Sequence, residues 1–272
     1  AGFAVRGSDL AEAARAAFAE AGGTACTTAA EAATGVEAVI TMLPDGKVVR
    51  ETVLGTGGVA KALGVGGIVV DMSSSEPMGT QALGKDLAAL GIGCVDAPVS
   101  GGVKRAIDGS LAIMAGGTPE QVERVKPLLA PMARAVIATG PLGSGHAMKA
   151  LNNYVSAAGL LAACEALYVG QKFGLTGETV VDVLNASTGK NNSTEVKLKP
   201  FVLSGAFNSG FSLALMAKDL RIAADLGTSM GLDPSSLIET TARMWEAARG
   251  ELKDSPDHTA IYRFVAEHEA KG

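Results

Sequence analysis

The sequence is poor in cysteine, histidine and aromatic residues, and each shortage excludes a class of protein. The three cysteines, Cys26, Cys94 and Cys164, are odd in number and widely spaced. This pattern argues against a disulfide framework and favours a reducing, cytoplasmic compartment. The three histidines stand apart from one another and from the cysteines, so we expect no zinc site. Aromatic residues make up only 4% of the chain, and the core must therefore be largely aliphatic.

Long apolar runs and an excess of positive charge are lacking too. No run approaches the roughly 20 apolar residues that cross a bilayer, and we recognise no signal peptide. The formal net charge of −5 provides no electrostatic attraction for nucleic acid or an anionic membrane, and we expect neither as a partner. With 272 residues, 47% of them hydrophobic, the chain is long enough for two modest domains.

A Gly-x-Gly-x-x-Gly turn after a first strand is also missing. In dinucleotide-binding domains that turn holds the pyrophosphate. The segment 55–60 spells Gly-x-Gly-x-x-Ala, but it lies within a helical stretch, and we interpret it as a loop. Ala1 stands close to the end of what would be the first helix of such a domain. We therefore expect the first strand and its glycine turn to precede Ala1 in the full-length protein.

Apolar runs and helical patterns alternate through the first half of the chain. The runs show no polar alternation, as is typical of a sheet covered on both faces. The expected strands are 3–7, 36–42, 67–72, 93–96, 111–115 and 135–138. The expected helices are 10–21, 48–63 with a glycine interruption, 79–90 and 119–132. This order predicts a doubly wound, parallel or mixed α/β sheet.

After residue 143 the strand patterns stop, and helices are expected at 146–173, 177–185, 213–230, 234–249 and 258–270. We predict a dinucleotide-binding domain over 1–143 and an all-helical substrate and oligomerisation domain over 144–272. The helix 146–173 is apolar on several sides. A second copy of the chain is therefore expected to cover part of it, in a homodimer or homotetramer.

Two motifs carry the chemistry. Asp96-Ala-Pro-Val-Ser-Gly-Gly102 ends a strand in a loop of small residues, where backbone N–H groups can approach an anionic substrate. The segment 143–153 opens a long helix on glycines and places Lys149 and Asn153 four residues apart, on one face. Partial desolvation would lower the pKa of such a lysine from about 10.4 and allow it to exchange a proton with a hydroxyl. The pair predicts acid/base chemistry on a small hydroxy acid.

In their order and separation, five motifs resemble the β-hydroxyacid dehydrogenase family, typified by 3-hydroxyisobutyrate dehydrogenase. They are Thr41-Met-Leu-Pro44, Asp71-Met-Ser-Ser-Ser-Glu-Pro77, Asp96-Ala-Pro-Val-Ser-Gly-Gly102, Gly143-Ser-Gly-His-Ala-Met-Lys-Ala-Leu-Asn-Asn153 and Leu215-Met-Ala-Lys-Asp-Leu220. The likeness runs over essentially the whole chain. It implies a Rossmann-type domain, then an all-α domain like that of 6-phosphogluconate dehydrogenase. It also implies NAD as cofactor, with NADP as the alternative, and no metal.

The resemblance implies a role for both chemical motifs. Lys149 matches the family's general acid/base, and Asn153 would hydrogen-bond the substrate or the lysine. Ser100, Gly101 and Gly102 would hold the substrate carboxylate through the serine hydroxyl and backbone N–H groups.

Further positions match family contacts to the cofactor or substrate. Met42, Leu43 and Pro44 would pack along the dinucleotide, Ser74 would lie near the nicotinamide ribose, and Lys218 would close over the cofactor. Phe211 and Asp219 fall at pocket positions, although core packing and a solvated charge explain them equally. Asp9 follows the second strand of such a domain. There it would accept a hydrogen bond from the ribose 2′-hydroxyl and favour NAD, or act as a helix N-cap, or do both.

The combined prediction is an NAD(P)-dependent oxidoreductase of a small β-hydroxy acid. One alternative is a semialdehyde reductase of the same family, of the tartronate, succinic or glyoxylate type. Another, from a different class, is a truncated relative that keeps the fold but is not catalytic.

Overall fold

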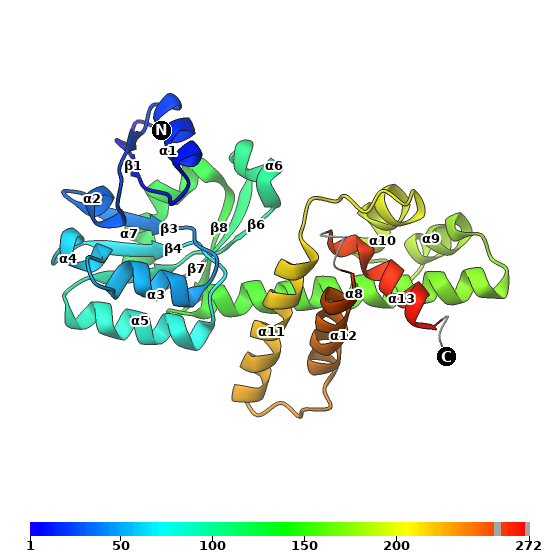
Figure 1. Ribbon diagram of the computed structural model, residues 1–272. Helices are drawn as coiled ribbons and strands as arrows, with labels where there is room; N and C mark the ends of the chain where they lie inside the picture. Colours follow the sequence, from blue (N-terminus) through cyan, green and yellow to red (C-terminus); the bar gives the residue numbers. More distant parts are fainter. Residues whose placement is uncertain (253–256, 270–272) are drawn as a thin grey trace. The chain divides into compact units, whose positions relative to one another are not determined.

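The structure, a computed structural model, describes residues 1–252 and 257–269. Its chain divides into two compact units, Ala1–Lys149 and Ala150–Gly272. The division falls inside the 30-residue helix α8 (Ser144–Phe173), shown in green in Figure 1. The domain boundary expected at residue 143 stays a prediction.

A six-stranded mixed sheet forms the centre of the first unit. Its strands are β3 (Ala38–Thr41), β4 (Ile68–Asp71), β5 (Gly93–Asp96), β6 (Val99–Ser100), β7 (Leu111–Gly116) and β8 (Ala133–Gly140). Strands β3, β4 and β5 run parallel, whereas β7 is antiparallel to β5 and β6 and pairs in parallel with β8. A separate parallel pair joins β1 (Arg6–Gly7) to β2 (Thr24–Ala25).

Helices cover both faces of this sheet because successive strand side chains point to opposite sides. On one face Ile68 and Val70 pack with Val125 of α7 (Pro119–Leu129). On the other, Val69 packs with residues of α3 (Gly46–Leu54), α4 (Val59–Leu63) and α5 (Pro77–Ala89), the helices grouped on one side of the sheet in Figure 1. The predicted doubly wound α/β architecture is confirmed.

The last residues of neighbouring strands lie side by side at one edge of the sheet. Thr41 of β3 is opposite Asp71 of β4, and Asp71 is opposite Asp96 of β5. Asp96 is in turn opposite Gly116 of β7. This register brings two carboxylates next to each other at the carboxyl ends of parallel strands.

Several predicted elements differ in extent. The first strand is only Arg6–Gly7, and the second expected helix is two helices. Within the segment 55–60 that we interpreted as a loop, residues 55–58 lie between these helices, whereas Val59 and Ala60 begin α4. Helix α7 ends at Leu129 and continues as a 3-10 turn over Ala130–Met132. Helix α1 spans Glu12–Glu20. Four further short elements of the first unit were not predicted, because a periodic pattern needs more residues than they contain: β2, α2 (Ala29–Ala33), β6 and α6 (Gly102–Ile107).

The described part of the second unit contains helices and no strand of its own. After α8 come α9 (Gly177–Ala186), α10 (Asn192–Val196), a π-helical segment (Leu198–Leu203), α11 (Leu213–Ser229), α12 (Leu237–Glu251) and α13 (Ile261–Glu269). Leu160, Leu220 and the single tryptophan, Trp245, are fully buried at their centre. The predicted all-helical architecture is confirmed, although α12 begins at Leu237 rather than residue 234.

The last predicted helix starts as a 3-10 turn, His258–Ala260, and its predicted end at residue 270 lies outside the described residues. Among the helices that the structure describes, none is long and apolar enough to cross a membrane.

Candidate functional site

Lys149 lies in the first unit, near the start of α8, and its side chain is half-buried. Its Nζ donates a hydrogen bond of 2.7 Å to the carbonyl oxygen of Val99. Because Val99 directly precedes Ser100, the structure places the predicted acid/base beside the segment predicted to hold the substrate carboxylate.

The segment Ser100–Gly102 is not the irregular loop that we expected. Val99–Ser100 forms β6 and pairs with β7, and Gly102 is the first residue of α6. The chain turns between them with φ of +136° at Gly101 and +68° at Gly102, values that favour glycine. A Cβ on Gly101 would also lie 2.6 Å from the side chain of Arg105. The glycines are therefore required by the turn itself.

The start of α8 is held by the carboxylate of Asp96, at the end of β5. Its Oδ1 accepts a hydrogen bond from Gly143 N and its Oδ2 one from His146 N, both at 2.7 Å. These N–H groups belong to a helix start, where intrahelical partners are lacking and negative charge is favourable. Asp96 is fully buried, and burial raises the pKa of its carboxyl, while the His146 charge and the two N–H groups act in the opposite direction.

Two glycines, Gly116 and Gly145, allow the chain to pack closely around Asp96. A Cβ on Gly116 would lie 2.4 Å from Asp96 Oδ1, and a Cβ on Gly145 would lie 2.3 Å from the Met114 carbonyl oxygen. Cβ atoms essentially never come this close to other heavy atoms. The close approach of β5, β7 and α8 thus depends on glycine at both positions.

A second buried carboxylate, Asp71, organises the loop after β4. Its Oδ1 accepts hydrogen bonds from Thr41 Oγ1 at 2.9 Å and Ser73 N at 3.0 Å. Its Oδ2 accepts one from Ser75 Oγ at 2.8 Å. Asp71 therefore fixes the conformation around Ser74, the residue predicted to lie near the nicotinamide ribose.

The imidazole of His146 lies between the two carboxylates. Its Nε2 is 3.7 Å from Asp71 Oδ2 and its Nδ1 is 3.7 Å from Asp96 Oδ2. Nε2 also lies 3.1 Å from the Ser73 carbonyl oxygen, which can only accept, so Nε2 carries a proton. Nδ1 is hydrogen-bonded to Thr80 Oγ1 at 2.8 Å.

These three residues, Asp71, Asp96 and His146, were part of the motifs in the sequence but received no role there. The sequence contained a signal, since each carboxylate ends an apolar strand. A charged residue in that place needs a buried partner. Among the described residues, no group of His, Cys, Asp and Glu could hold a metal ion.

The predicted cofactor residues of the first unit follow the carboxyl ends of strands β1, β3 and β4. Met42 comes directly after β3 and is exposed. Leu43 packs into the core under α3 and α5, and its N–H donates a 2.9 Å hydrogen bond to Ser73 Oγ. Pro44 follows it, and Ser74 is half-buried in the loop after β4. The loops after β3 and β4 are thus joined.

Asp9 lies two residues after β1. Its Oδ1 accepts a 2.8 Å hydrogen bond from Ala11 N. The N-cap of α1 is Ala11, which has no side-chain cap, so the interpretation of Asp9 as the N-cap is wrong. Its carboxylate instead closes the turn just before the helix, because an Asp side chain readily binds the N–H two residues on.

In the second unit Asn153 and Asp219 are brought together. Both are buried, and Asn153 Nδ2 donates a 2.6 Å hydrogen bond to Asp219 Oδ2. The interpretation of Asp219 as a solvated charge is therefore wrong. Asn152 Nδ2 donates to Asn153 Oδ1 at 3.2 Å, and Lys218 is half-buried on α11.

Phe211 belongs to a different cluster of the second unit. Its ring meets that of His258 edge-on, with centroids 5.6 Å apart. Its carbonyl oxygen accepts a 2.8 Å hydrogen bond from His258 N. These contacts agree with the interpretation of Phe211 as core packing.

Ser209, Asp257 and His258 form a hydrogen-bonded group in which Asp257 and His258 are buried and Ser209 is partly buried. Asp257 accepts hydrogen bonds of 2.9 Å from Gly210 N and Thr259 N, and Ser209 Oγ lies 3.1 Å from His258 Nδ1. The His258 ring stacks on Trp245 at 6.5 Å. Burial, with the nearby Lys197 charge, lowers the pKa of His258 to about 4, although Asp257 acts in the opposite direction.

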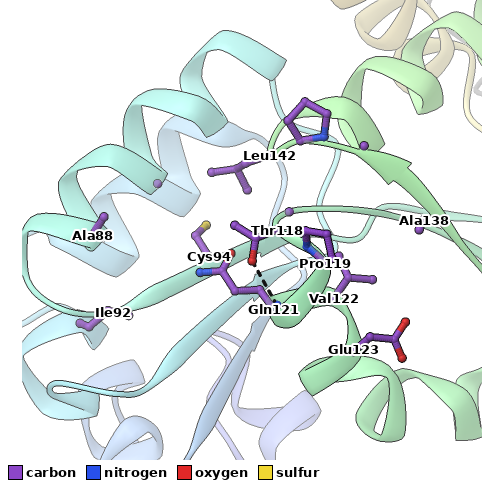
Figure 2. A pocket seen from close by; sticks show the side chains of 14 residues that line it. Ala88, Ile92, Cys94, Thr118, Pro119, Gln121, Val122, Glu123, Ala138 and Leu142 are labelled. Carbon is purple, nitrogen blue, oxygen red and sulfur yellow. Dashed lines mark hydrogen bonds between the residues drawn. The ribbon is translucent and has the colours of Figure 1, made fainter.

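The first unit also contains a mainly apolar cavity of about 660 Å³. Figure 2 shows side chains of α5, β5 and α7 around it, among them Ala88, Cys94 and Val122, together with Leu142. No predicted site residue lines it. Burial raises the pKa of the Cys94 thiol to about 12, so this side chain is not a thiolate at neutral pH.

Family models match both halves of the chain. The model described as the NAD-binding domain of 6-phosphogluconate dehydrogenase matches residues 1–140. The model described as NAD-binding of NADP-dependent 3-hydroxyisobutyrate dehydrogenase matches residues 143–265.

Named relatives cover most of the chain. The 2-(hydroxymethyl)glutarate dehydrogenase of Eubacterium barkeri is 34% identical over 262 residues, 96% of this chain and 87% of the relative. The 3-sulfolactaldehyde reductase of Escherichia coli strain K12 is 34% identical over 244 residues, 90% of this chain and 82% of the relative. A solved structure of Mycobacterium tuberculosis 3-hydroxyisobutyrate dehydrogenase with L-serine is 32% identical, with a TM-score of 0.88 over 97% of this chain and 91% of that one.

Proposed function

The chain belongs to the β-hydroxyacid dehydrogenase family of NAD(P)-dependent oxidoreductases, and we propose that it oxidises the hydroxyl of a small β-hydroxy acid. The observation that supports this substrate class is the 2.7 Å contact between Lys149 Nζ and the Val99 carbonyl oxygen. It puts a candidate proton carrier next to a turn of two glycines whose backbone an anion can approach.

The residues of the first unit fit the two ribose ends of NAD(P). Dinucleotides bind outside the carboxyl ends of parallel strands, where Asp9, Met42–Pro44 and Ser74 all lie. The carboxylate of Asp9 would accept a hydrogen bond from the 2′-hydroxyl of the adenosine ribose. It would repel a 2′-phosphate, which supports NAD over NADP. Lys218 would contribute from α11. When bound, the nicotinamide supplies the hydride acceptor.

The protein's own residues would orient the substrate and move one proton. Ser100, Gly101 and Gly102 hold the carboxylate, which fixes the hydroxyl carbon relative to the cofactor. The Lys149 amine, in its neutral form, takes the hydroxyl proton as the hydride leaves and becomes an ammonium, and Asn153 hydrogen-bonds the substrate or the lysine. Asp219 holds the Asn153 amide, and its place next to Asn153 supports its assignment to the pocket. Phe211 is proposed as a pocket residue on the family resemblance alone.

Reduced nicotinamide formation tests the proposal. Full-length protein is assayed by absorbance with NAD and then NADP against 3-hydroxyisobutyrate, L-serine, glycerate, 3-hydroxypropionate and 4-hydroxybutyrate. Lys149→Met should abolish turnover, whereas Lys85→Met, at an exposed lysine of the same unit, should leave it unchanged. Equal loss in both variants, or full activity in Lys149→Met, would contradict the role of Lys149.

A semialdehyde reductase is the second candidate, favoured by the 34% identity to a named 3-sulfolactaldehyde reductase. The corresponding semialdehydes with NADH or NADPH should then be consumed faster than the hydroxy acids are oxidised. If no substrate reacts in either direction, NAD binding is measured by calorimetry. An enzyme with another substrate should bind NAD, whereas a non-catalytic relative should not.

We also propose a homodimer or homotetramer in a reducing, cytoplasmic environment. On α8, Val155, Val169 and Phe173 are 67%, 63% and 84% exposed and form an apolar stripe along one side. A second copy would cover it. All three cysteines are free thiols, as a reducing compartment requires. Light scattering should give a dimer or tetramer mass that falls to the monomer mass in Val155→Asp/Val169→Asp.

A further inference from the structure

The segment 96–99 contacts α8 at two places, its first turn and the Lys149 side chain. At its first residue, the Asp96 carboxylate binds the N–H groups of Gly143 and His146. At the last residue of the segment, the Val99 carbonyl oxygen accepts a hydrogen bond from Lys149 Nζ. Lys149 follows His146 by three residues, almost one helical turn. One short stretch of chain thus fixes both the helix start and the side chain one turn further on.

We propose that Asp96 is a positioning residue for Lys149, which sets the distance between the lysine ammonium and the Ser100–Gly102 turn. The proposal rests on the proposed function, because that function gives Lys149 its task. Asp96 itself has no route to the substrate, since it is fully buried and its two oxygens accept hydrogen bonds from the N–H groups of Gly143, just before α8, and His146, in its first turn.

The surroundings of Asp96 leave little freedom for another arrangement. Gly116 and Gly145 lack the Cβ atoms that would collide with Asp96 or the Met114 carbonyl oxygen. His146, whose N–H binds Asp96, is itself anchored through its ring to Ser73 and Thr80. The helix start is therefore held from β5 through Asp96 and from the loop after β4 through His146. A side chain that keeps the shape of Asp96 but not both acceptors should loosen it.

Asp96→Asn is that change, since the amide presents one acceptor and one donor to the two N–H groups. A donor facing a donor must turn or shift the first turn of α8. The expected result is a kcat reduced at least tenfold, with the KM for NAD changed less than twofold. The split arises because the lysine, and not the predicted cofactor loops, is displaced.

A second readout, independent of activity, follows the lysine itself. Limiting acetic anhydride labels accessible amines, and peptide mass spectrometry gives the rate at Lys149. We expect faster labelling of Lys149 in Asp96→Asn than in the wild type, because its hydrogen bond to Val99 is weakened. Lys85 serves as the internal reference within each sample.

Thr118→Val is the matched control. Thr118 is the N-cap of α7, and its hydroxyl accepts a 3.3 Å hydrogen bond from Gln121 N. The substitution removes this hydrogen bond and so weakens another helix start of the same unit. The control should lower the melting temperature but change neither kcat nor the labelling of Lys149. If Asp96→Asn does not fold, judged by circular dichroism, Asp96→Ser replaces it, because a serine hydroxyl reaches only one of the two N–H groups.

Unchanged labelling of Lys149 in a folded Asp96 variant overturns the proposal. So does faster labelling with an unchanged kcat, or an equal loss of kcat in Thr118→Val. If the wild-type protein turns over no substrate and does not bind NAD, the proposed function fails, and the labelling rates alone decide whether Asp96 positions Lys149.

Discussion

Acidification should destabilise the second unit through His258. Burial lowers the pKa of His258 to about 4, whereas an unfolded chain has a histidine pKa of about 6.5. The folded pKa is the lower one, so the unfolded state binds the proton first as the pH falls. The stabilisation is therefore fully present above about pH 6.5 and is lost as the pH falls toward about 4. Burial raises the pKa of Asp257, but hydrogen bonds and the His258 charge outweigh it, so that the pKa is lowered. Protonation of Asp257 at lower pH therefore causes a further loss of stability.

The magnitude follows from the difference between the two pKa values. Between about pH 7 and about pH 5, linkage gives a loss of about 2 kcal/mol in the free energy of unfolding. The full difference corresponds to about 3 kcal/mol, reached below about pH 4. For a unit of this size, about 2 kcal/mol lowers the melting temperature by several degrees.

Trp245 makes the measurement specific, because it is the single tryptophan, is fully buried and stacks on the His258 ring. Urea unfolding followed by its fluorescence at both pH values gives the loss for the second unit. His258→Gln, which cannot titrate, should show a pH dependence smaller by about 2 kcal/mol. Equal pH dependence in the wild type and the variant would refute the argument that His258 is buried in its neutral form.

Three further predictions concern single substitutions, two in the first unit and one in the second. Gly145→Ala should destabilise the protein by about 1–3 kcal/mol, because its Cβ would lie 2.3 Å from the Met114 carbonyl oxygen. In contrast, Gly250→Ala, whose Cβ meets nothing within 4 Å, should stabilise α12 by about 0.5–1 kcal/mol, and urea unfolding of both variants compares them. Asp9→Ala should lower the ratio of kcat/KM with NAD to that with NADP about tenfold, because the 2′-phosphate is no longer repelled; an unchanged ratio would place Asp9 outside the ribose site.

The sequence predicts the elements with a strong apolar pattern well and the short elements without one poorly. Helix α8 and strands β4 and β5 have strong apolar patterns, and their observed bounds lie within two residues of those expected. The turn at Gly101 and the helix α6 that follows it had no such signal. Six residues contain less than two helical turns, and tertiary contacts decide their conformation.

The candidate site divides in the same way. Lys149 and Asn153 could be found from their helical spacing and the family resemblance. The partners of Asp96 could not, because its two hydrogen bonds join residues 47 and 50 positions apart. Nor could the burial of Asp219, since its partner Asn153 is 66 residues away. Local patterns indicate which residues share a helix face, but pairings across such separations depend on how the whole unit packs.

The division of α8 between the two units has a consequence for the order of folding. From Ala150 onward its buried residues join the core of the second unit, including Leu160 and Leu167. Its first turn depends on Asp96, a contact of long sequence separation that forms only when β5 is in place. The part of α8 from Ala150 onward can therefore form together with the second unit, whereas its first turn forms only once the first unit has folded. Amide exchange should find the N–H of His146 and that of Leu160 in different cooperative units, with separate opening free energies.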